Sequence, residues 1–327
     1  MWTLLATLNK NLVWAIPAML LAGFGFGLAT DAASLKALIL PFTFLMVYPM
    51  MVTLKIRQVF AGGDLKAQVL AQAINFALIP FVAYGLGTVF FGDSPYLVLG
   101  LLLAALVPTS GMTISWTGFA KGNLAAAVKM TVIGLIAGSL ATPFYVKALL
   151  GTQVTIDLAQ VFQQIVLIVF LPMAVGYATQ RVLVKRYGQQ DFQQQLAPRF
   201  PGLSTFGVLG IVFIAMALKA RAVAAEPELL LRILFPLLLL YLVNYLVSTV
   251  VGKFLLPRSD AIALVYGTVM RNLSIALAVA INAFGPAGSD AALVIALAYV
   301  IQVQSAAWYV KFTPQLFGRQ PLETQAA

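Results

Sequence analysis

Apolar stretches long enough to cross a membrane alternate with short polar connections along the chain. A helix that crosses roughly 30 Å of hydrocarbon needs about 20 apolar residues. The pattern predicts ten such helices, over residues 11–29, 36–54, 66–91, 95–120, 124–149, 159–183, 203–219, 228–252, 260–284 and 289–313. The predicted fold class is an all-α membrane protein surrounded by a lipid bilayer. The first stretch lacks a small-residue cleavage site, so we interpret it as an anchor.

The composition supports a membrane protein and excludes several other classes. Hydrophobic residues make up 61% of the 327 residues and charged residues 9%, against about 45–50% and about 25% in soluble domains. These values exclude a soluble enzyme, a disordered scaffold and a nucleic-acid partner. The chain contains no Cys and no His. Disulfides, thiolate or imidazole metal sites and Ser-His or Cys-His catalysis are therefore excluded, and we expect no metal site and no cofactor.

The net charge of +10 has its source in the connections between the predicted helices. Thirteen basic residues fall on the side of the N-terminus: Lys10, Lys55, Arg57, Lys66, Lys121, Arg181, Lys185, Arg186, Arg199, Lys253, Arg258, Lys311 and Arg319. Five fall on the opposite side: Lys36, Lys147, Lys219, Arg221 and Arg232. The positive-inside rule then places both termini in the cytoplasm of a multi-pass protein of the cell membrane.

A polar stretch over residues 184–202 is the one long connection, and it divides the predicted helices into five before and five after. We predict that it is a cytoplasmic linker between a segment 1–183, which holds the first six helices, and a segment 203–327, which holds the last four. Five predicted helices before this stretch and five after it suggest two inverted repeats, a common architecture of secondary transporters. The fourth and ninth helices are both interrupted, at residues 107–111 and 269–272. Matched interruptions of this kind indicate a binding site at the middle of the membrane.

The ten acidic residues all fall in connections, termini or helix edges. Proton relays and cation sites usually need a carboxylate at membrane depth. An intramembrane enzyme would likewise need acids, His or Cys, so we expect no enzymatic activity. A channel is distinguished from a carrier by a far higher conductance.

Two basic residues lie inside predicted helices, and each has two interpretations. Arg271 lies near the bilayer centre, where a guanidinium is costly to bury. It either is held by backbone carbonyls and locks the repeats together, or binds an anion through its planar fork. The absence of an acidic partner favours anion binding. Lys129 lies near the cytoplasmic face, and we expect its ammonium to extend to water or to lipid headgroups.

Hydroxyl and amide groups surround the interruptions. Proline at position 108 frees backbone groups and leaves a half-helix N-terminus that favours an anion. The candidate substrate-binding residues are Arg271, Asn272, Met270, Thr109, Ser110, Thr113 and Asn75. The structural alternative is that the hydroxyls hydrogen-bond the free backbone groups of a kinked helix and that the amides join neighbouring helices.

Three segments resemble the bile acid:sodium symporter superfamily: residues 108–123 (PTSGMTISWTGFAKGN), 270–281 (MRNLSIALAVAI) and 45–51 (LMVYPMM). Within it, they look closest to the arsenical-resistance transporter branch. The resemblance covers about residues 11–313. It implies ten helices in two inverted five-helix repeats, with broken helices 4 and 9 crossing. It also implies a panel group of helices 1, 2, 6 and 7 and a core group of helices 3–5 and 8–10.

The chain departs from the family pattern at the positions that the resemblance assigns to ions. Sodium-coupled members carry Ser-Asn where this chain has Thr113-Ile114, and Ser and Thr where it has Ala127 and Thr131. A glutamate shared by two sodium ions aligns with Gly267, and glutamines align with Arg271 and Asn75. The cysteine of the arsenical branch aligns with Thr109. The resemblance leaves Thr131, Thr268 and Lys129 as candidates for coupling an ion.

We therefore expect a secondary active transporter of a small organic or inorganic anion that works by alternating access without the paired-sodium site. In this hypothesis Arg271 is a tethered cation that replaces bound sodium, and the coupling ion is a proton or is absent. The first alternative is arsenite or antimonite efflux. The second is a sodium-coupled, bile-acid-like symporter whose ion is held by backbone carbonyls at Thr268 and Met270 with Asn75.

Overall fold

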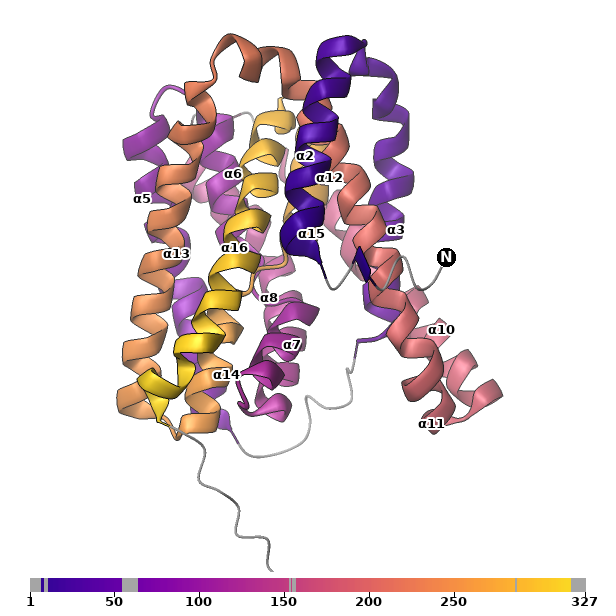
Figure 1. The fold of residues 1–327 in the computed structure, drawn as a ribbon, viewed down its shortest axis with the longest axis vertical. Coiled ribbons are helices and arrows are strands. Elements are labelled where there is room, and N and C mark those ends of the chain that lie inside the picture. The colour runs from indigo at the N-terminus through magenta and orange to yellow at the C-terminus, as the bar shows by residue number, and fades with distance from the viewer. Residues whose placement is uncertain are drawn as a thin grey trace, which may run out of the picture.

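The computed structural model describes residues 7–8, 11–54, 64–152, 154, 157–285 and 287–318. The expectations for Lys10, Lys55, Arg57 and Arg319 lie outside these residues. Most of the described part of the chain is helical, and most helices run roughly along one common axis (Figure 1). Within the described residues, seven helical stretches are long and apolar enough to cross a membrane, and three shorter apolar helices cover Trp14–Ala29, Pro95–Leu106 and Leu273–Phe284. The chain is therefore a multi-pass helical membrane protein, whereas the ten-span count and the inverted repeat stay predictions.

The first part of the chain forms helices close to the predicted ranges. They are α2 (Leu12–Ala29), η1 (Ala32–Leu38), α3 (Ile39–Val52), α4 (Leu65–Gln72), η3 (Ala73–Leu78), α5 (Ile79–Phe91), α6 (Pro95–Leu106), α7 (Gly111–Phe119) and α8 (Leu124–Leu150). The segment η3 is a single π-helical turn between α4 and α5. It immediately precedes the first residues of α5, which include Pro80. Proline has no N–H for the helical ladder, so a local change of pitch at this place has a direct cause.

The second part contains the longest helices. They are α9 (Leu158–Ile165), η4 (Val166–Phe170), α10 (Leu171–Tyr187), α11 (Gln189–Asp191), η5 (Phe192–Leu196), η6 (Ala197–Arg199), α12 (Phe200–Ala225), α13 (Glu228–Leu255), α14 (Arg258–Val269), α15 (Leu273–Phe284) and α16 (Gly288–Phe317).

The polar segment 184–202 is largely helical, and its role as a cytoplasmic linker between two segments of the chain stays a prediction. Helix α10 continues to Tyr187, and α12 already begins at Phe200. Short helical turns fill the residues between them. Gln and Lys are good helix formers, so polarity alone does not end a helix. Polarity marks where the helix leaves the apolar environment.

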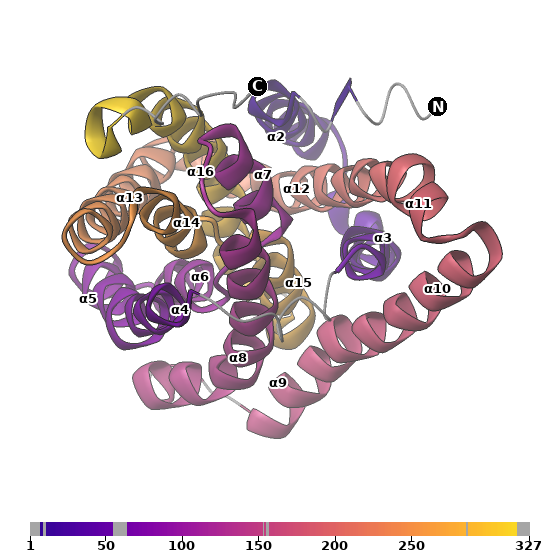
Figure 2. The ribbon, with the colours of Figure 1, turned by 90° about the horizontal axis from the view of Figure 1, so that it is seen from below.

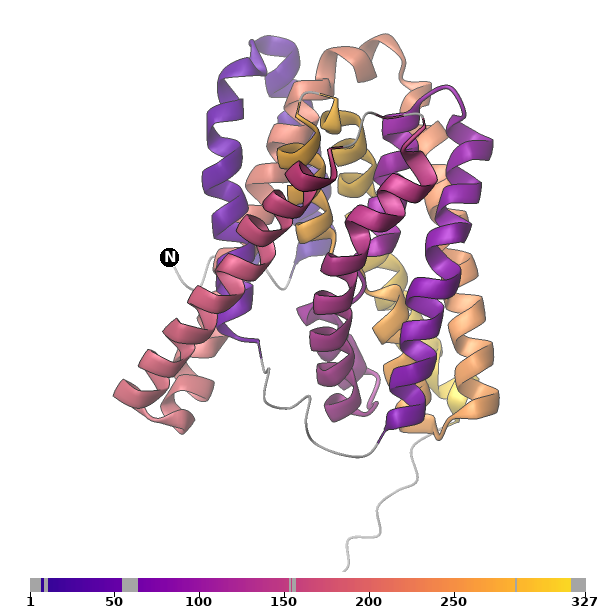
Figure 3. The ribbon, with the colours of Figure 1, turned by 180° about the vertical axis from the view of Figure 1, so that it is seen from behind.

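The helices pack in two groups that contact each other along one side. Helices α2, α3, α10 and α12 form the first group, and the panel group below means these four helices. Helices α4 to α8 and α13 to α16 form the second, the core group (Figures 2 and 3). Within the panel group the backbones approach closely: a Cβ added to Gly27 would collide with the carbonyl of Ala217, and one added to Gly207 with the backbone of Met46. Small residues of this kind let membrane helices pack tightly.

Large apolar side chains cover the outside of the molecule as well as its interior. Trp14 is 76% exposed, Leu21 73% and Leu231 70%, although each lies on an apolar helix. A protein in water would expose so many apolar side chains only at an interface. In a membrane these side chains face the lipid, so the exposed surface agrees with the composition.

Candidate functional site: the crossing of two broken helices

Two interrupted helices meet in the middle of the core group. Helix α6 ends at Leu106 and α7 begins at Gly111, while α14 ends at Val269 and α15 begins at Leu273. Both predicted interruptions are therefore confirmed. The extended residues between the half-helices pair with each other, through an antiparallel bridge of Pro108 with Arg271. The N–H of Asn272 donates to the carbonyl of Val107 at 2.8 Å.

A side-chain amide from α16 completes the pairing of this extended backbone. The Arg271 N–H donates to Oε1 of Gln302 at 2.8 Å, and Nε2 of Gln302 donates to the Arg271 carbonyl at 3.1 Å. The Tyr241 hydroxyl also donates to Oε1 of Gln302, at 2.9 Å. Irregular backbone at membrane depth needs such partners because no water is available in hydrocarbon. The side-chain amide of Gln302 thus pairs with both backbone groups of Arg271, as a neighbouring β-strand would.

Thr109 holds a backbone conformation that L-residues rarely adopt, with φ of +64°. Its hydroxyl lies within hydrogen-bond distance of the carbonyls of Pro108 (2.6 Å), Met130 (3.2 Å) and Thr131 (3.1 Å). A Cβ added to Gly134 of α8 would lie 2.6 Å from this hydroxyl. The bend of the chain after α6 therefore packs directly against α8 at Gly134, where any larger side chain would collide with Thr109.

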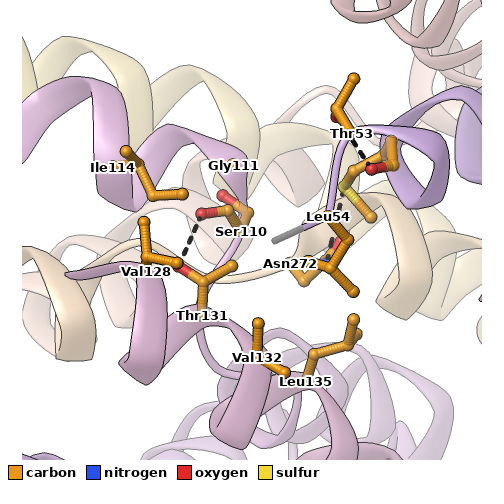
Figure 4. Close-up of a pocket in the computed structure, with 11 residues that line it drawn as sticks. Thr53, Leu54, Ser110, Gly111, Ile114, Val128, Thr131, Val132, Leu135 and Asn272 are labelled. Carbon is orange, nitrogen blue, oxygen red and sulfur yellow. Dashed lines mark hydrogen bonds between the residues drawn. The ribbon is translucent and has the colours of Figure 1, made fainter. Parts of the chain in front are cut away.

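A cavity lies beside the crossing, between the last turn of α3 and helices α7 and α8 (Figure 4). It is partly open to its surroundings and contains about 430 Å³ of space not filled by atoms. Its lining is mostly apolar. The lining residues are Met50, Thr53, Leu54, Ser110, Gly111, Ile114, Val128, Thr131, Val132, Leu135 and Asn272. Met50 belongs to α3 of the panel group and residues 53 and 54 directly follow that helix, whereas the others belong to the core group, so the cavity lies at the boundary between the two.

Two helix N-termini border this cavity. Ser110 is the N-cap of α7, and its Oγ accepts from the Met112 N–H at 3.2 Å. Asn272 is the N-cap of α15, and its Oδ1 accepts from the Ile275 N–H at 3.3 Å. Each N-terminus carries partial positive charge from N–H groups that no carbonyl of a preceding helical turn accepts. None of the described lining residues is charged. The electrostatics of the cavity thus favour an anion or a polar neutral molecule over a cation.

Arg271 lies at the crossing but does not line the cavity. Its side chain is buried, and Nη1 donates to the Ala105 carbonyl of α6 at 3.0 Å. Nη2 has no hydrogen-bond partner within the described residues. The geometry therefore matches the first of the two interpretations, a guanidinium held by backbone oxygen between broken helices. Direct contact of Arg271 with a bound anion stays a prediction.

The remaining candidates divide between the cavity and the core. Of those predicted from the sequence, Ser110, Thr131 and Asn272 line the cavity. Thr109, Thr113 and Met270 are fully buried and hold the interruptions together.

Asn75 and Thr268 join helices. Asn75 Nδ2 donates to the Gly267 carbonyl at 3.0 Å. The Thr268 hydroxyl lies 2.6 Å from that of Ser248, and its carbonyl accepts from Asn244 Nδ2 at 2.9 Å.

Lys129 differs from the expectation. Its side chain does not reach water: it is 5% exposed, and Nζ lies 2.6 Å from Oδ1 of Asp64. The Asp64 side chain is 6% exposed, so one carboxylate is buried despite its position before a helix. Sequence patterns missed this pair because the two residues are 65 positions apart. A buried charge needs a partner, and the fold supplies it.

The space that the family resemblance assigns to a glutamate is occupied by a thioether. A Cβ added to Gly267 would collide with Sδ of Met130 on α8. The position therefore holds no carboxylate, and a larger side chain there would need the flexible Met130 side chain to move. The observed donors nearby, backbone carbonyls and one amide, do not supply the negative charge that a paired-sodium site uses.

Sequence reasoning also missed the panel side of the cavity. Met50, Thr53 and Leu54 line it; Met50 lies in the segment 45–51 that carries the family resemblance, whereas Thr53 and Leu54 lie outside that segment. Gln302 was one of several amides within predicted helices, and its role depends on the irregular backbone opposite it.

The broken helices, the cavity between two helix groups and the lipid-facing surface define a membrane protein of the secondary-transporter class. Residues 40–226 match the family model described as the Sodium Bile acid symporter family. Because this match covers more than half of the chain, the protein belongs to that family of membrane transporters.

Curated relatives are distant. The chain is 26% identical over 274 residues to the arsenical-resistance protein Acr3 of Alkaliphilus metalliredigens, covering 79% of this chain and 76% of that protein. It is 27% identical over 221 residues to YocS of Bacillus subtilis, an uncharacterized sodium-dependent transporter, covering 65% and 63%. Sodium/bile acid cotransporter 7 of Danio rerio is 24% identical over 168 residues, covering 47% and 48%.

Proposed function

We propose that this protein is a secondary active transporter that moves a small organic or inorganic anion across the cell membrane by alternating access, without a paired-sodium site. The observation that carries the proposal is the uncharged cavity bordered by the N-termini of α7 and α15. Half-helix N-termini that point at a site are a common way to hold anionic groups in transporters. The family membership supports transport rather than catalysis.

The position of the cavity supports alternating access. Its walls come from Met50 to Leu54 at the end of α3 and from α7 and α8 of the core group. Movement of one group against the other would open and close such a site, as inverted-repeat transporters do. In this proposal the panel and core groups are the two moving bodies, and both termini lie in the cytoplasm.

The charge of Arg271 supports an anion even though the side chain does not line the cavity. Arg271 directly precedes Asn272, which does line it. Its charge is buried with no acidic partner in the described part of the chain. In a low-dielectric interior a charge acts over a longer distance than in water. We propose that Arg271 supplies the permanent positive potential that bound sodium supplies elsewhere.

Two other candidates follow from the relatives. Arsenite or antimonite efflux is favoured by the Acr3 relative. This chain has Thr109 in a thiol-free sequence, so oxygen groups would have to hold the cargo. A resistance assay in an arsenite-sensitive strain tests it.

A sodium-coupled organic-anion symporter is favoured by the sodium-dependent relative. Steep dependence of uptake on sodium would support that candidate and contradict the tethered-cation hypothesis.

The direct test is uptake into proteoliposomes with four radiolabelled probes, lactate, phosphate, sulfate and taurocholate, in sodium and in potassium buffers. We expect uptake of at least one probe at equal rates in the two buffers. A thermal-shift screen with the same probes measures binding, because a ligand specific to the folded state raises its stability with occupancy.

The variant Asn272→Asp tests the anion site. It keeps the oxygen that caps α15 and adds a negative charge to the cavity wall. We expect anion uptake to fall at least tenfold, which corresponds to about 1.4 kcal/mol. The matched control is Asn282→Asp, the same change on the same helix at a residue that does not line the cavity. Equal rates for the two variants would contradict the proposed site.

A further inference from the structure

The outward face of α10 is apolar along its first half and basic along its second. We give this name to eight exposed residues: Leu171, Ala174, Val175, Ala178, Arg181, Val182, Lys185 and Arg186. Most of them recur at intervals of three and four residues, which places them on one side of a helix. Leu171 is 50% exposed and Val182 63%. One continuous surface therefore passes from apolar to cationic along the helix.

The length of the apolar half matches one leaflet of a bilayer. Leu171 and Arg181 are ten residues apart, which corresponds to about 15 Å along a helix. That is half of a hydrocarbon core of about 30 Å. Tyr177 lies close to the change from apolar to basic, and tyrosine is common where membrane helices meet the headgroups. The basic half thus begins at the depth of the lipid phosphates.

Helix α10 lies at the edge of the bundle, and its last turns lean away from the core group (Figures 1 and 2). Its outward face is therefore open to lipid along its whole length. The Figure 2 view also shows α10 as the outermost helix on this side of the molecule.

The three cations of this face have no carboxylate partner among the described residues. The ion pairs of the described part join Lys129 to Asp64 and Lys219 to Asp290. The Arg181 guanidinium carbon lies 4.8 Å from the centre of the Tyr177 ring. A ring contact uses the flat face of the guanidinium and leaves the N–H groups at its edge for oxygen atoms.

A basic last turn also complements the dipole of a helix. That role accounts for Lys185 and Arg186, which lie in the last turn of α10. It does not account for Arg181, which lies earlier in the helix, on the same face as the apolar residues.

We propose that the outward face of α10 binds an anionic phospholipid, with the phosphate at Arg181 and Lys185 and an acyl chain along Leu171 to Ala178. The planar fork of an arginine can donate two N–H groups to one phosphate, and lysine adds a compact positive charge. The apolar half selects a lipid over a soluble anion. This inference goes beyond the proposed function and does not depend on it.

The opposite face of α10 holds the end of α3. Gln180 Nε2 donates to the Val52 carbonyl at 2.9 Å, and a Cβ added to Gly176 would lie 2.8 Å from the backbone of Met51. The residues that follow, Thr53 and Leu54, line the cavity. A lipid on the outward face would therefore hold the panel wall of the cavity in place within the bilayer.

The test measures which lipid lies beside α10. The chain has no cysteine, so Val182→Cys places a single thiol for a fluorophore within the basic half. The labelled protein is reconstituted in phosphatidylcholine with a minor fraction of phosphatidylglycerol, and one or the other lipid carries a nitroxide that quenches on contact. One basic residue near an anionic surface changes affinity about fivefold. With two such residues, we expect phosphatidylglycerol to be enriched about tenfold or more at this label.

Three comparisons make the test specific. A label at Leu246→Cys on the lipid-exposed face of α13, which is 56% exposed, should show no preference between the lipids. Salt at about 1 M should reduce the enrichment at Val182→Cys, because it screens exposed charges. Millimolar inorganic phosphate should leave the enrichment unchanged, since it lacks acyl chains. Displacement of the lipid by phosphate would overturn the proposal.

The variant Arg181→Gln with Lys185→Gln, made in the labelled protein, should remove the enrichment. Both side chains are exposed, so we expect the fold to be kept. The matched control is Lys253→Gln with Lys311→Gln, the same change of net charge at two exposed residues of the core group, which should keep the enrichment. Equal quenching by the two lipids in the protein with Arg181 and Lys185 intact would overturn the proposal. Enrichment that persists in the double variant would overturn it as well.

Discussion

At the scale of single residues, neighbouring positions of the crossing have different roles. Arg271 and Asn272 are adjacent in extended backbone, where successive side chains point to opposite sides. The amide lines the cavity and the guanidinium contacts α6. Thr109 and Ser110 also have different roles: Ser110 lines the cavity, whereas the left-handed conformation of Thr109 directs its hydroxyl toward α8. The sequence placed both pairs of residues at the interruptions, but the direction of each side chain depends on a backbone that has no regular period.

The variant Arg271→Gln tests whether the buried charge acts on the anion. We expect anion uptake to fall at least tenfold, because the positive potential beside Asn272 is lost. Circular dichroism and size-exclusion chromatography should show a folded protein, since a neutral side chain is less costly to bury at membrane depth. Arg271→Lys keeps the charge without the planar fork and should retain more activity than Arg271→Gln. Full activity of Arg271→Gln would leave Arg271 with a structural role alone.

At the scale of elements, the interruptions of two helices were predictable and the contacts between helices were not. Proline and polar residues inside apolar stretches indicated both breaks, and the observed ends agree with them within about a residue. The burial of Lys129 was not predictable, because it needs Asp64 from another helix. The continuation of α10 through basic residues to Tyr187 was missed for a related reason. Hydropathy reports the surroundings of a helix better than its length.

The close contact between Gly134 of α8 and Thr109 gives a prediction about stability. Gly134→Ala places a methyl group 2.6 Å from the Thr109 hydroxyl. We expect a loss of about 1–3 kcal/mol of stability, typical of overpacking, measured as a lower midpoint of thermal unfolding in detergent. The matched control is Gly85→Ala in α5, where an added Cβ meets nothing within 4 Å. That variant should be as stable as the wild type or slightly more so, because alanine favours the helix. Equal midpoints for the two variants would contradict the close packing at Thr109.

At the scale of the whole molecule, several side-chain contacts between described residues join the panel and core groups. Asn282 of α15 donates to the Thr43 hydroxyl of α3 at 3.3 Å, and Asn272 donates to Sδ of Met50. Lys219 of α12 and Asp290 of α16 form an ion pair of 2.7 Å. Both side chains are partly exposed, so the pair contributes little to stability. An exposed pair of this kind can break and re-form as two bodies move. Its position makes it a reporter of the movement that the proposed function requires.

Cross-linking at this position tests the movement. The chain has no cysteine, so Lys219→Cys with Asp290→Cys introduces the only two thiols. We expect a bifunctional, reducible thiol cross-linker to stop anion uptake and a reducing agent to restore it. The control pair is Tyr48→Cys with Thr179→Cys, at two hydroxyls 2.8 Å apart within the panel group, where cross-linking should leave uptake unchanged. Undiminished uptake by the fully cross-linked Lys219–Asp290 variant would rule out a relative displacement of the two groups.

The amide of Gln302 has a consequence for the whole transport cycle. It satisfies both backbone groups of Arg271, and both residues belong to the same group of helices. Unwound backbone in a carrier would otherwise need to exchange its partners each time the protein changes its facing side. Here the buried peptide groups of Arg271 keep the Gln302 amide as their partner when the two groups of helices move. The energy barrier between inward-facing and outward-facing forms can therefore be set by the sliding of apolar surfaces, with no rehydration of the crossing.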